Sequence, residues 1–291
     1  MFTPLPKAFD YHNFLREVLR TSDSRSYFLA TEENMQNRSI ANFPYRNYFY
    51  GIGLSLEGKR QIQVGTETYE YAKGSLLVIG PGIIRQWLDS DDFLETEALF
   101  FTAELFQSPI NAHFLNDLPL FKTGIQHVLP LSESDFESAH RVFDLLRQYK
   151  NDEKIVASLT LALIEMTAQF QPQNKPSETN KDARSLQISR QFDALLQKHY
   201  LENKEVAFYA EKLSLTPNHL SETIKSATGK SAKKRIEEVL IMEAKSLLKQ
   251  TDMSIKEITY WLGFEDPSYF TKFFKNAENI TPNTYRGIKT T

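Results

Sequence analysis

The chain has 291 residues, a length that favours two domains over one. It carries 34 Lys and Arg residues against 37 Asp and Glu residues, so its net charge of −3 indicates no particular class of partner. Hydrophobic residues make up 41% of the chain, enough to build a globular core, which excludes global disorder. Cysteine is absent, which excludes disulfides, zinc–thiolate and iron–sulfur sites, and a cysteine nucleophile.

The charge is distributed unevenly along the chain. Residues 184–291 hold 17 basic and 13 acidic residues, whereas residues 1–183 hold 17 basic and 24 acidic ones. Such asymmetry is typical of a chain with one nucleic-acid-binding half, although many ordinary helical domains carry a similar charge. No stretch approaches the roughly 20 apolar residues that span a bilayer, and the first 20 residues contain no continuous apolar run. We therefore expect a cytoplasmic protein that does not contact membranes.

Residues 43–106 have the pattern of short strands. Some segments there are rich in aromatic and β-branched residues, and in others polar and apolar residues alternate. Glu57-Gly58 is expected to form a turn. The run Gly80-Pro81-Gly82 marks a strand end. The number and spacing of these segments predict a small sandwich or barrel. We predict strands over residues 47–56, 61–64, 66–71, 75–79, 83–88 and 95–105.

The strands are followed by a helical hairpin and a linker. Apolar residues recur at helical intervals in residues 134–149 and 153–170, and we expect this hairpin to supply a two-fold interface. Residues 171–184 contain two prolines and no aromatic or large aliphatic side chain, which is the composition of a linker. The chain should thus form a regulatory and dimerisation domain over residues 1–170 and a second domain over residues 185–291.

Every element predicted after the linker is a helix. Two of these helices begin alike, because Thr216 precedes Pro217 and Asp266 precedes Pro267, about 50 residues further on. Each follows a shorter helix and a turn of three or four residues, the pattern of a helix-turn-helix unit. We predict helices over residues 185–200, 205–213, 217–228, 232–250, 255–262 and 267–277.

The helix that joins the two units has a length suited to DNA. Its 19 residues, Ala232–Gln250, span roughly 28 Å at about 1.5 Å per residue. Recognition helices in successive major-groove turns on one face of DNA lie about 34 Å apart. The joining helix can therefore hold two recognition helices near the separation that DNA requires.

Residues from about 190 to 287 carry a long and specific family pattern. Its first part comprises Ala210, Leu213, Leu220, Ile224, Lys225, Thr228-Gly229, Ile236, Glu243-Ala244-Lys245 and Leu247-Leu248. Its second part comprises Ser254-Ile255-Lys256-Glu257-Ile258, Gly263-Phe264, Asp266, Ser268-Tyr269-Phe270, Phe273-Phe274-Lys275, Thr281-Pro282 and Tyr285-Arg286. Together these residues resemble the DNA-binding domain of the AraC/XylS family of bacterial transcription regulators. The chain departs from the family pattern at Glu222, Arg235, Val239, Thr259 and Asn279, where a basic residue, an aromatic, Arg, Ala and Gly respectively are usual.

This resemblance implies a sequence-specific transcription regulator with two domains. The run from Gly74 to Gly82 is similar to the strand and turn that the cupin fold repeats, so the resemblance implies a cupin-like N-terminal β-barrel and an α+β fold for the chain. The partners that it implies are double-stranded DNA, a small organic effector, RNA polymerase and a second copy of the chain.

The exposed faces of the two recognition helices supply the candidate DNA-binding residues. Asn pairs with adenine, Lys with guanine, Glu with the cytosine amino group, and Ser and Thr with several base edges. Lys225 and Lys275, late in their helices, are expected to meet phosphate. Each of these residues could also belong to an ordinary solvated helix face. The candidates are Asn218, Ser221, Glu222 and Lys225 in the first helix, and Ser268, Thr271, Lys272 and Lys275 in the second.

Aromatic residues and one cation in the strand region suit a small organic effector, although such residues also build barrel cores and rims. The candidates are Tyr45, Tyr48, Tyr50, Tyr69, Tyr71, Arg85 and Trp87. No two of the six histidines lie close together in the sequence of the strand region, so we expect no metal site and no cofactor.

Catalytic motifs are incomplete, and we expect no catalytic residue. Gly229-Lys230-Ser231 imitates the end of a phosphate-binding loop, but Ile224 stands where its first glycine is required. Two alternatives stay open at this point: a cupin-type metal enzyme with a helical appendage, and a DNA-binding regulator that responds to no ligand.

Overall fold

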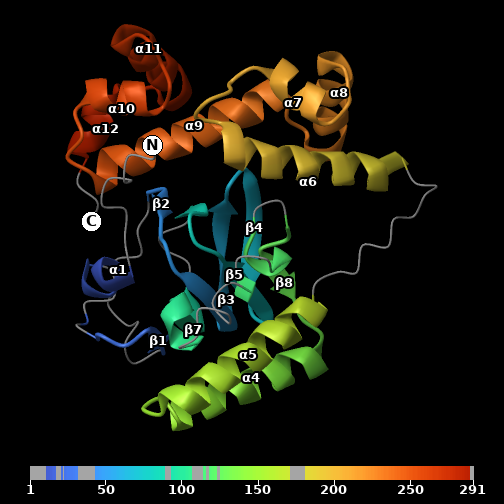
Figure 1. The fold of residues 1–291 in the computed structure, drawn as a ribbon, viewed down its shortest axis with the longest axis vertical. Coiled ribbons are helices and arrows are strands. Elements are labelled where there is room, and N and C mark those ends of the chain that lie inside the picture. The colour runs from blue at the N-terminus through green and yellow to red at the C-terminus, as the bar shows by residue number, and fades with distance from the viewer. Residues whose placement is uncertain are drawn as a thin grey trace. The chain divides into compact units, whose positions relative to one another are not determined.

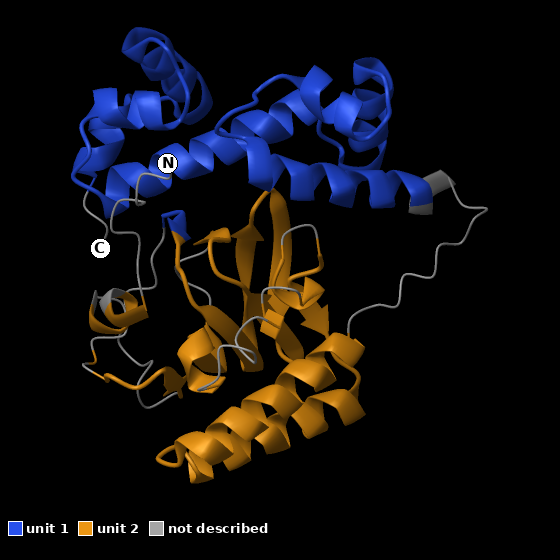
Figure 2. Ribbon diagram, viewed as in Figure 1, with its two compact units in different colours: residues 1–8, 43–45, 174–291 blue, residues 9–42, 46–173 orange. Residues whose placement is uncertain are grey.

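A computed structural model describes residues 11–17, 21, 23–31, 43–88, 93–106, 114–115, 118–122, 125–170 and 181–288. The chain divides into two units, and we describe each by itself (Figure 2). The N-terminal unit holds the described residues from 11 to 31 and from 46 to 170, and the C-terminal unit holds residues 181–288 together with 43–45. The predicted α+β class is confirmed, because an antiparallel sheet with a helical hairpin is followed by a half made of helices.

The N-terminal unit is built on an eight-stranded sheet with the order β1-β7-β3-β5-β8 along its main path (Figure 1). Strands β4 and β6 pair with the second half of β3, and β2 pairs with β6. The strands are β1 (Tyr27–Ala30), β2 (Tyr45–Arg46), β3 (Tyr50–Val64), β4 (Glu67–Ala72), β5 (Ser75–Ile79), β6 (Ile84–Trp87), β7 (Leu94–Phe101) and β8 (Val128–Pro130). Short helices are α1 (Tyr11–Glu17), η1 (Ala103–Phe106) and η2 (Pro119–Phe121).

The turn predicted at Glu57-Gly58 is wrong. Strand β3 is 15 residues long and runs through both of these residues, and its register against β7 shifts just before them, between Ser55 and Glu57. Gly58 adopts a left-handed φ of +78°, and a Cβ there would overlap the carbonyl of Phe93. The extra residue of this β-bulge is Leu56. Glycine is needed at position 58 because the neighbouring strand approaches its backbone closely. The chain reverses later, at Gly65-Thr66 between β3 and β4.

Helices α4 (Glu133–Gln148) and α5 (Glu153–Phe170) form the predicted hairpin. Their inner faces bury Phe143 and Leu163 in the same apolar cluster as Leu54 and Leu99 of the sheet. An ion pair of 3.1 Å joins Arg147 of α4 to Glu97 of β7, whose side chain is almost fully buried. Burial raises the pKa of Glu97, and the nearby Arg147 opposes this effect.

The C-terminal unit consists of seven helices among the residues described. Helix α9 runs through its length, with α7 and α8 at one end and α10, α11 and α12 at the other (Figure 1). Helix α6 begins at Lys181, four residues before its predicted start, and residues 171–180 of the expected linker lie outside the described residues. The helices are α6 (Lys181–His199), α7 (Val206–Lys212), α8 (Pro217–Thr228), α9 (Ala232–Gln250), α10 (Ile255–Trp261), α11 (Pro267–Glu278) and α12 (Pro282–Gly287).

Side-chain caps fix the starts of these helices. The hydroxyl groups of Thr216, Ser231 and Thr281 accept hydrogen bonds from the backbone N–H groups of His219, Lys234 and Thr284. Each cap satisfies a donor that the helix itself leaves unpaired. At α10 a reciprocal capping box joins Ser254 and Glu257, and these hydrogen bonds lower the pKa of the Glu257 carboxyl.

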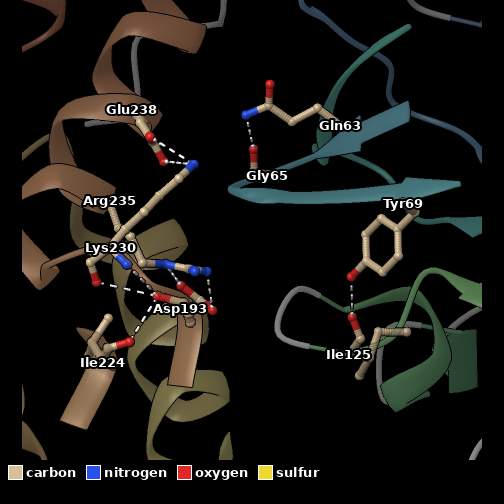
Figure 3. Close-up of polar contacts among 10 residues, drawn as sticks. Gln63, Gly65, Tyr69, Ile125, Asp193, Ile224, Lys230, Arg235 and Glu238 are labelled. Atoms are coloured by element: carbon tan, nitrogen blue, oxygen red, sulfur yellow. Dashed lines mark hydrogen bonds and ion pairs between the residues drawn. The ribbon is translucent and has the colours of Figure 1, made fainter. Parts of the chain in front are cut away.

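Charged groups tie α9 to its neighbours at both ends. Near its start, buried Arg235 donates hydrogen bonds of 3.1 and 2.7 Å to Asp193 of α6 (Figure 3). Towards its end, Lys245 forms an ion pair of 3.0 Å with Glu278 of α11. Lys245 and Lys249 also lie over the ring of Tyr285 in α12, at 5.5 and 5.0 Å from its centroid. Helix α9 is therefore braced by charged groups as well as by its apolar core.

Candidate nucleic-acid interface

Helices α8 and α11 are structural repeats of one another. Both have 12 residues, begin with proline after a capping side chain, and end at a residue in the left-handed conformation. Their starts, Pro217 and Pro267, lie 50 positions apart, and the same offset relates Gly229 to Asn279 at their C-terminal ends. Equivalent positions of the two helices can therefore be compared directly.

One face of each helix is buried and the other is open. Leu220 and Ile224 of α8 and Phe270 and Phe274 of α11 are completely buried in one apolar cluster, at positions related by the offset of 50. Because each helix buries this side, its opposite face is left for another molecule. Each helix thus presents to solvent the face on which the sequence places the candidate DNA-binding residues.

The predicted DNA-binding residues occupy these open faces. Asn218, Glu222 and Lys225 of α8 are exposed, and Ser221 is half-buried. In α11, Ser268, Lys272 and Lys275 are exposed, and Thr271 is half-buried. The hydroxyl of Thr271 already donates a hydrogen bond of 2.7 Å to the carbonyl of Pro267. Its methyl group is therefore the part of the side chain that is available to contact a base. The structure brings each set of four together on one helix, as the sequence predicts.

Two further exposed positions on these helices were not among the predicted DNA-binding residues. His219 of α8 and Tyr269 of α11 are equivalent under the offset of 50, and both are exposed, Tyr269 to 63%. They lie in the first turn of each helix, the part of a recognition helix that contacts base edges. Comparison of the two repeats position by position would have indicated them in the sequence.

The two faces differ in charge. The candidate face of α8 combines the acidic Glu222 with Lys225, whereas the equivalent positions of α11 are Lys272 and Lys275. Lys225 and Lys275 lie in the last turn of their helices. Because phosphate contacts require positive charge, α11 is the better suited of the two to the DNA backbone.

The predicted effector-binding residues fall into separate groups. Tyr69 of β4 and Trp87 of β6 both lie opposite Ile62 of β3 in the register of the sheet. Since side chains alternate between the two faces of a strand, Tyr71 and Arg85, two positions away, point to the same face. The structure therefore brings together Tyr69, Tyr71, Arg85 and Trp87.

The other three predicted effector residues lie elsewhere. Tyr50 is buried and stacks on Phe101 in the main core of the unit, with 5.2 Å between ring centroids. Tyr45 is buried at the short strand β2, and Tyr48 is exposed. Of the seven, only the four residues on β4 and β6 thus share one face of the sheet, and two of them, Tyr71 and Arg85, are buried there.

Polar groups are buried beside these four aromatic and basic residues. Arg85 is buried and donates a hydrogen bond to the side-chain oxygen of Asn47, which is itself buried. His127 lies edge-on to Tyr69 and its Nδ1 is 2.9 Å from the carbonyl of Val78. Burial lowers the pKa of His127 to about 4, and the charge of Arg85 adds to this effect, so the imidazole is neutral near pH 7. Tyr69 donates to the carbonyl of Ile125 (Figure 3).

Comparison with known proteins identifies the C-terminal unit. The family model described as a helix-turn-helix domain matches residues 209–288. The C-terminal domain of the response regulator yesN from Fusobacterium nucleatum is 30% identical, over 33% of this chain and 93% of that one, with a TM-score of 0.31. The chain belongs to the AraC/XylS family. It is a DNA-binding transcription regulator.

Full-length relatives of the AraC/XylS family cover both units of the chain. The transcriptional activator RhaS of Escherichia coli O81 (strain ED1a) is 23% identical over 263 residues, which are 84% of this chain and 88% of RhaS. ToxT of Vibrio cholerae is 17% identical, over 90% of this chain and 98% of that one, with a TM-score of 0.39. One ToxT structure contains a bound unsaturated fatty acid.

The structure explains three of the departures from the AraC/XylS pattern. Arg235 is paired with Asp193. Thr259 is buried, and its hydroxyl donates a hydrogen bond of 2.8 Å to the carbonyl of Ile255. Asn279 adopts a left-handed φ of 61°, which asparagine tolerates better than most residues. Nothing in the structure explains Val239 beyond its burial in the core.

The residues described contain no group of three or more His, Cys, Asp or Glu side chains arranged to hold a metal ion. None of the helices described is both long and apolar enough to cross a bilayer.

Proposed function

We propose that this regulator inserts α8 and α11 into successive major-groove turns of double-stranded DNA. Asn218, Ser221 and Glu222 would read bases from α8, and Ser268, Thr271 and Lys272 from α11. Lys225 and Lys275 would contact phosphates. The observation that carries this proposal is the 50-residue repeat, which places the same four positions on the open faces of two helices joined by α9.

The spacing of the two helices supports this arrangement. Helix α9 has 19 residues, or roughly 28 Å of helix, and the recognition helices extend from its two ends. Two recognition helices about 34 Å apart meet the same face of the duplex one turn apart. A single protein molecule would therefore cover two adjacent major-groove segments.

Selection from a pool of random duplexes tests this function. The full chain should enrich one sequence that contains two short conserved elements about 10 base pairs apart. The variant in which Asn218, Ser221 and Glu222 are all Ala should lose selectivity in one element only, and the equivalent variant of Ser268, Thr271 and Lys272 in the other. Enrichment of no sequence, or of a single element lost in both variants, would contradict the proposal.

The N-terminal unit is proposed to sense a small organic molecule. Tyr69, Tyr71, Arg85 and Trp87 share one face of the sheet and combine aromatic surface with a cation, which suits a small organic ligand. Arg85 and Asn47 are buried as a hydrogen-bonded pair in the same unit. The relatives named RhaS are activators, so the proposed output is activation through contact with RNA polymerase, in the cytoplasm and without catalysis.

Residues 1–170 are proposed to dimerise the regulator through the α4–α5 hairpin. Large apolar side chains remain exposed on this hairpin. They are Leu145 of α4, Tyr149 directly after α4 and Leu161 of α5, which are 40%, 38% and 37% exposed. A two-fold interface, the commonest symmetry of oligomers, would cover them. Sedimentation of the full chain as a dimer that Leu145→Glu converts to a monomer supports this interface, and a monomeric wild type contradicts it.

A further inference from the structure

The loop that joins α6 to α7 connects the two helix-turn-helix units without passing through α9. Lys204 of this loop donates hydrogen bonds to the carbonyl of Leu201, at 3.2 Å, and to the carbonyl of Gly263, at 2.8 Å. Gly263 lies 59 residues away, in the turn between α10 and α11. The ammonium group also lies 5.2 Å from the ring centroid of Phe264, in the same turn.

The loop is itself fixed to the first unit. The hydroxyl of Tyr209, a fully buried residue of α7, donates a hydrogen bond of 2.6 Å to the carbonyl of Asn203. The backbone N–H of Asn203 in turn donates to the carbonyl of His199 at the end of α6. A continuous set of contacts thus runs from α7 through residues 201–204 to the turn of the second unit.

The two turns of the repeat show that this contact constrains the sequence. Ser214, in the turn of the first unit, and Gly263, in the turn of the second, both have a left-handed φ, of 56° and 68°. Serine is thus compatible with that backbone in the first turn. At Gly263 a Cβ would overlap the carbonyl oxygen of Leu201 and lie 2.6 Å from Nζ of Lys204. The second turn therefore requires glycine because the loop packs directly against it.

We propose that Lys204 is a positioning residue that sets the separation and relative orientation of α8 and α11. A hydrogen bond from a charged donor is stronger than one between neutral groups. With its stem packed beside Phe264, Lys204 gives the two units a second connection besides α9. The regulator would then tolerate only one spacing between the two DNA elements. The part of this inference that concerns DNA rests on the proposed function.

The structural half of this inference is tested without DNA. Because the chain contains no cysteine, Ser226→Cys and Asn276→Cys introduce a single pair of spin labels on exposed positions of α8 and α11. The distribution of label distances should be narrow in the otherwise unchanged chain and clearly broader with Lys204→Met. Methionine keeps the length and the apolar stem but cannot donate a hydrogen bond.

Lys212→Met is the matched control. Lys212 lies 5.6 Å from the ring centroid of Phe208 within the first unit, so this change also removes one charge and one cation–ring contact. It leaves the connection between the units intact, and the label distribution should stay narrow. Should Lys204→Met fail to fold, Lys204→Leu, which likewise cannot donate a hydrogen bond, carries the same measurement. Equal widths in the Lys204 and Lys212 variants overturn the proposal.

The functional half uses the duplex selected by the full chain, together with the same duplex carrying one extra base pair between its two elements. Lys204→Met should reduce the loss of affinity caused by the insertion by about ten-fold. Lys212→Met should leave that ratio at its wild-type value, since the loss of one positive charge weakens binding to both duplexes equally. An unchanged ratio in Lys204→Met contradicts the positioning role. Failure to select any duplex contradicts the proposed function instead. In that case the label distances alone decide whether Lys204 holds the two units together.

Discussion

Arg235 of α9 donates two hydrogen bonds, of 3.1 and 2.7 Å, to the carboxylate of Asp193 in α6. The arginine is 1% exposed, and the side chain of the aspartate 14%. A bidentate pair of this kind fixes the direction of both helices, because the planar guanidinium accepts only one geometry. Helix α9 carries the recognition helices, so this pair fixes the first helix of the C-terminal unit relative to the DNA-reading elements.

Removal of one partner should be costly. Asp193→Ala leaves the guanidinium buried without its carboxylate, and we expect a loss of about 3 kcal/mol in the free energy of unfolding. The double variant Arg235→Met with Asp193→Leu replaces the pair by apolar side chains and should recover most of that loss. Chemical denaturation of the full chain, followed by its helical signal, measures both. A double variant no more stable than Asp193→Ala would contradict this account of the pair.

Two glycines with similar backbones should respond differently to alanine. Gly229 and Gly263 have φ values of +75° and +68°, but a Cβ at Gly229 would meet nothing within 4 Å. Gly229→Ala should cost about 1 kcal/mol, the conformational strain alone. Gly263→Ala should cost at least about 2 kcal/mol more, because the Leu201 carbonyl and Lys204 must also move. Equal losses of unfolding free energy would show that the loop can withdraw from the turn freely.

The pH dependence of the N-terminal unit should contain a contribution from His127. Burial lowers its pKa to about 4, whereas an unfolded histidine titrates near about 6.5. Between these values the unfolded chain binds the extra proton, so this contribution to stability is complete above about pH 6.5 and is lost as the pH falls towards about 4.

The matching variant isolates this contribution. His127→Gln should be less stable than the wild type at pH 7.5, and the difference in unfolding free energy should shrink by about 2 kcal/mol at pH 5. All other titrating groups are common to both proteins and cancel in the comparison. A difference that stays constant over this range would show that His127 titrates normally in the folded state.

Salt dependence separates phosphate contacts from base contacts. Lys225→Ala or Lys275→Ala should weaken binding to all duplexes and lower the slope of log affinity against log salt by about 1. Lys154→Ala, which removes an exposed charge from α5 in the other unit, should leave the slope unchanged. If a recognition-helix lysine instead altered the preference at one base pair while the slope stayed constant, it would belong to base readout.

The sequence predicted the C-terminal unit in more detail than the N-terminal one. Helices α8 and α9 match their predicted bounds because Thr216 with Pro217, and Ser231 before Ala232, give local start signals. Strands β1 and β8, of four and three residues, were missed. They are too short for a periodic pattern, and β1 pairs with β7 about 70 residues away, without a turn signal between them.

The same distinction applies to the candidate sites. The exposed faces of α8 and α11 follow from helical periodicity, which is local, and the sequence therefore placed those residues together. The grouping of Tyr69 with Trp87 depends on the register of two strands against β3, and Lys204 meets Gly263 across 59 residues. Such contacts depend on tertiary packing, which one sequence does not reveal.

Hydroxyl-radical footprinting of the full chain on its selected duplex shows whether one chain reads two major-groove segments with α8 and α11. We expect two protected segments on one face of the duplex, about 10 base pairs apart. Replacement of Asn218 and Ser221 by Ala should weaken one segment, and replacement of Ser268 and Lys272 by Ala should weaken the other. A single protected segment, or two segments on opposite faces of the duplex, would contradict the proposed function.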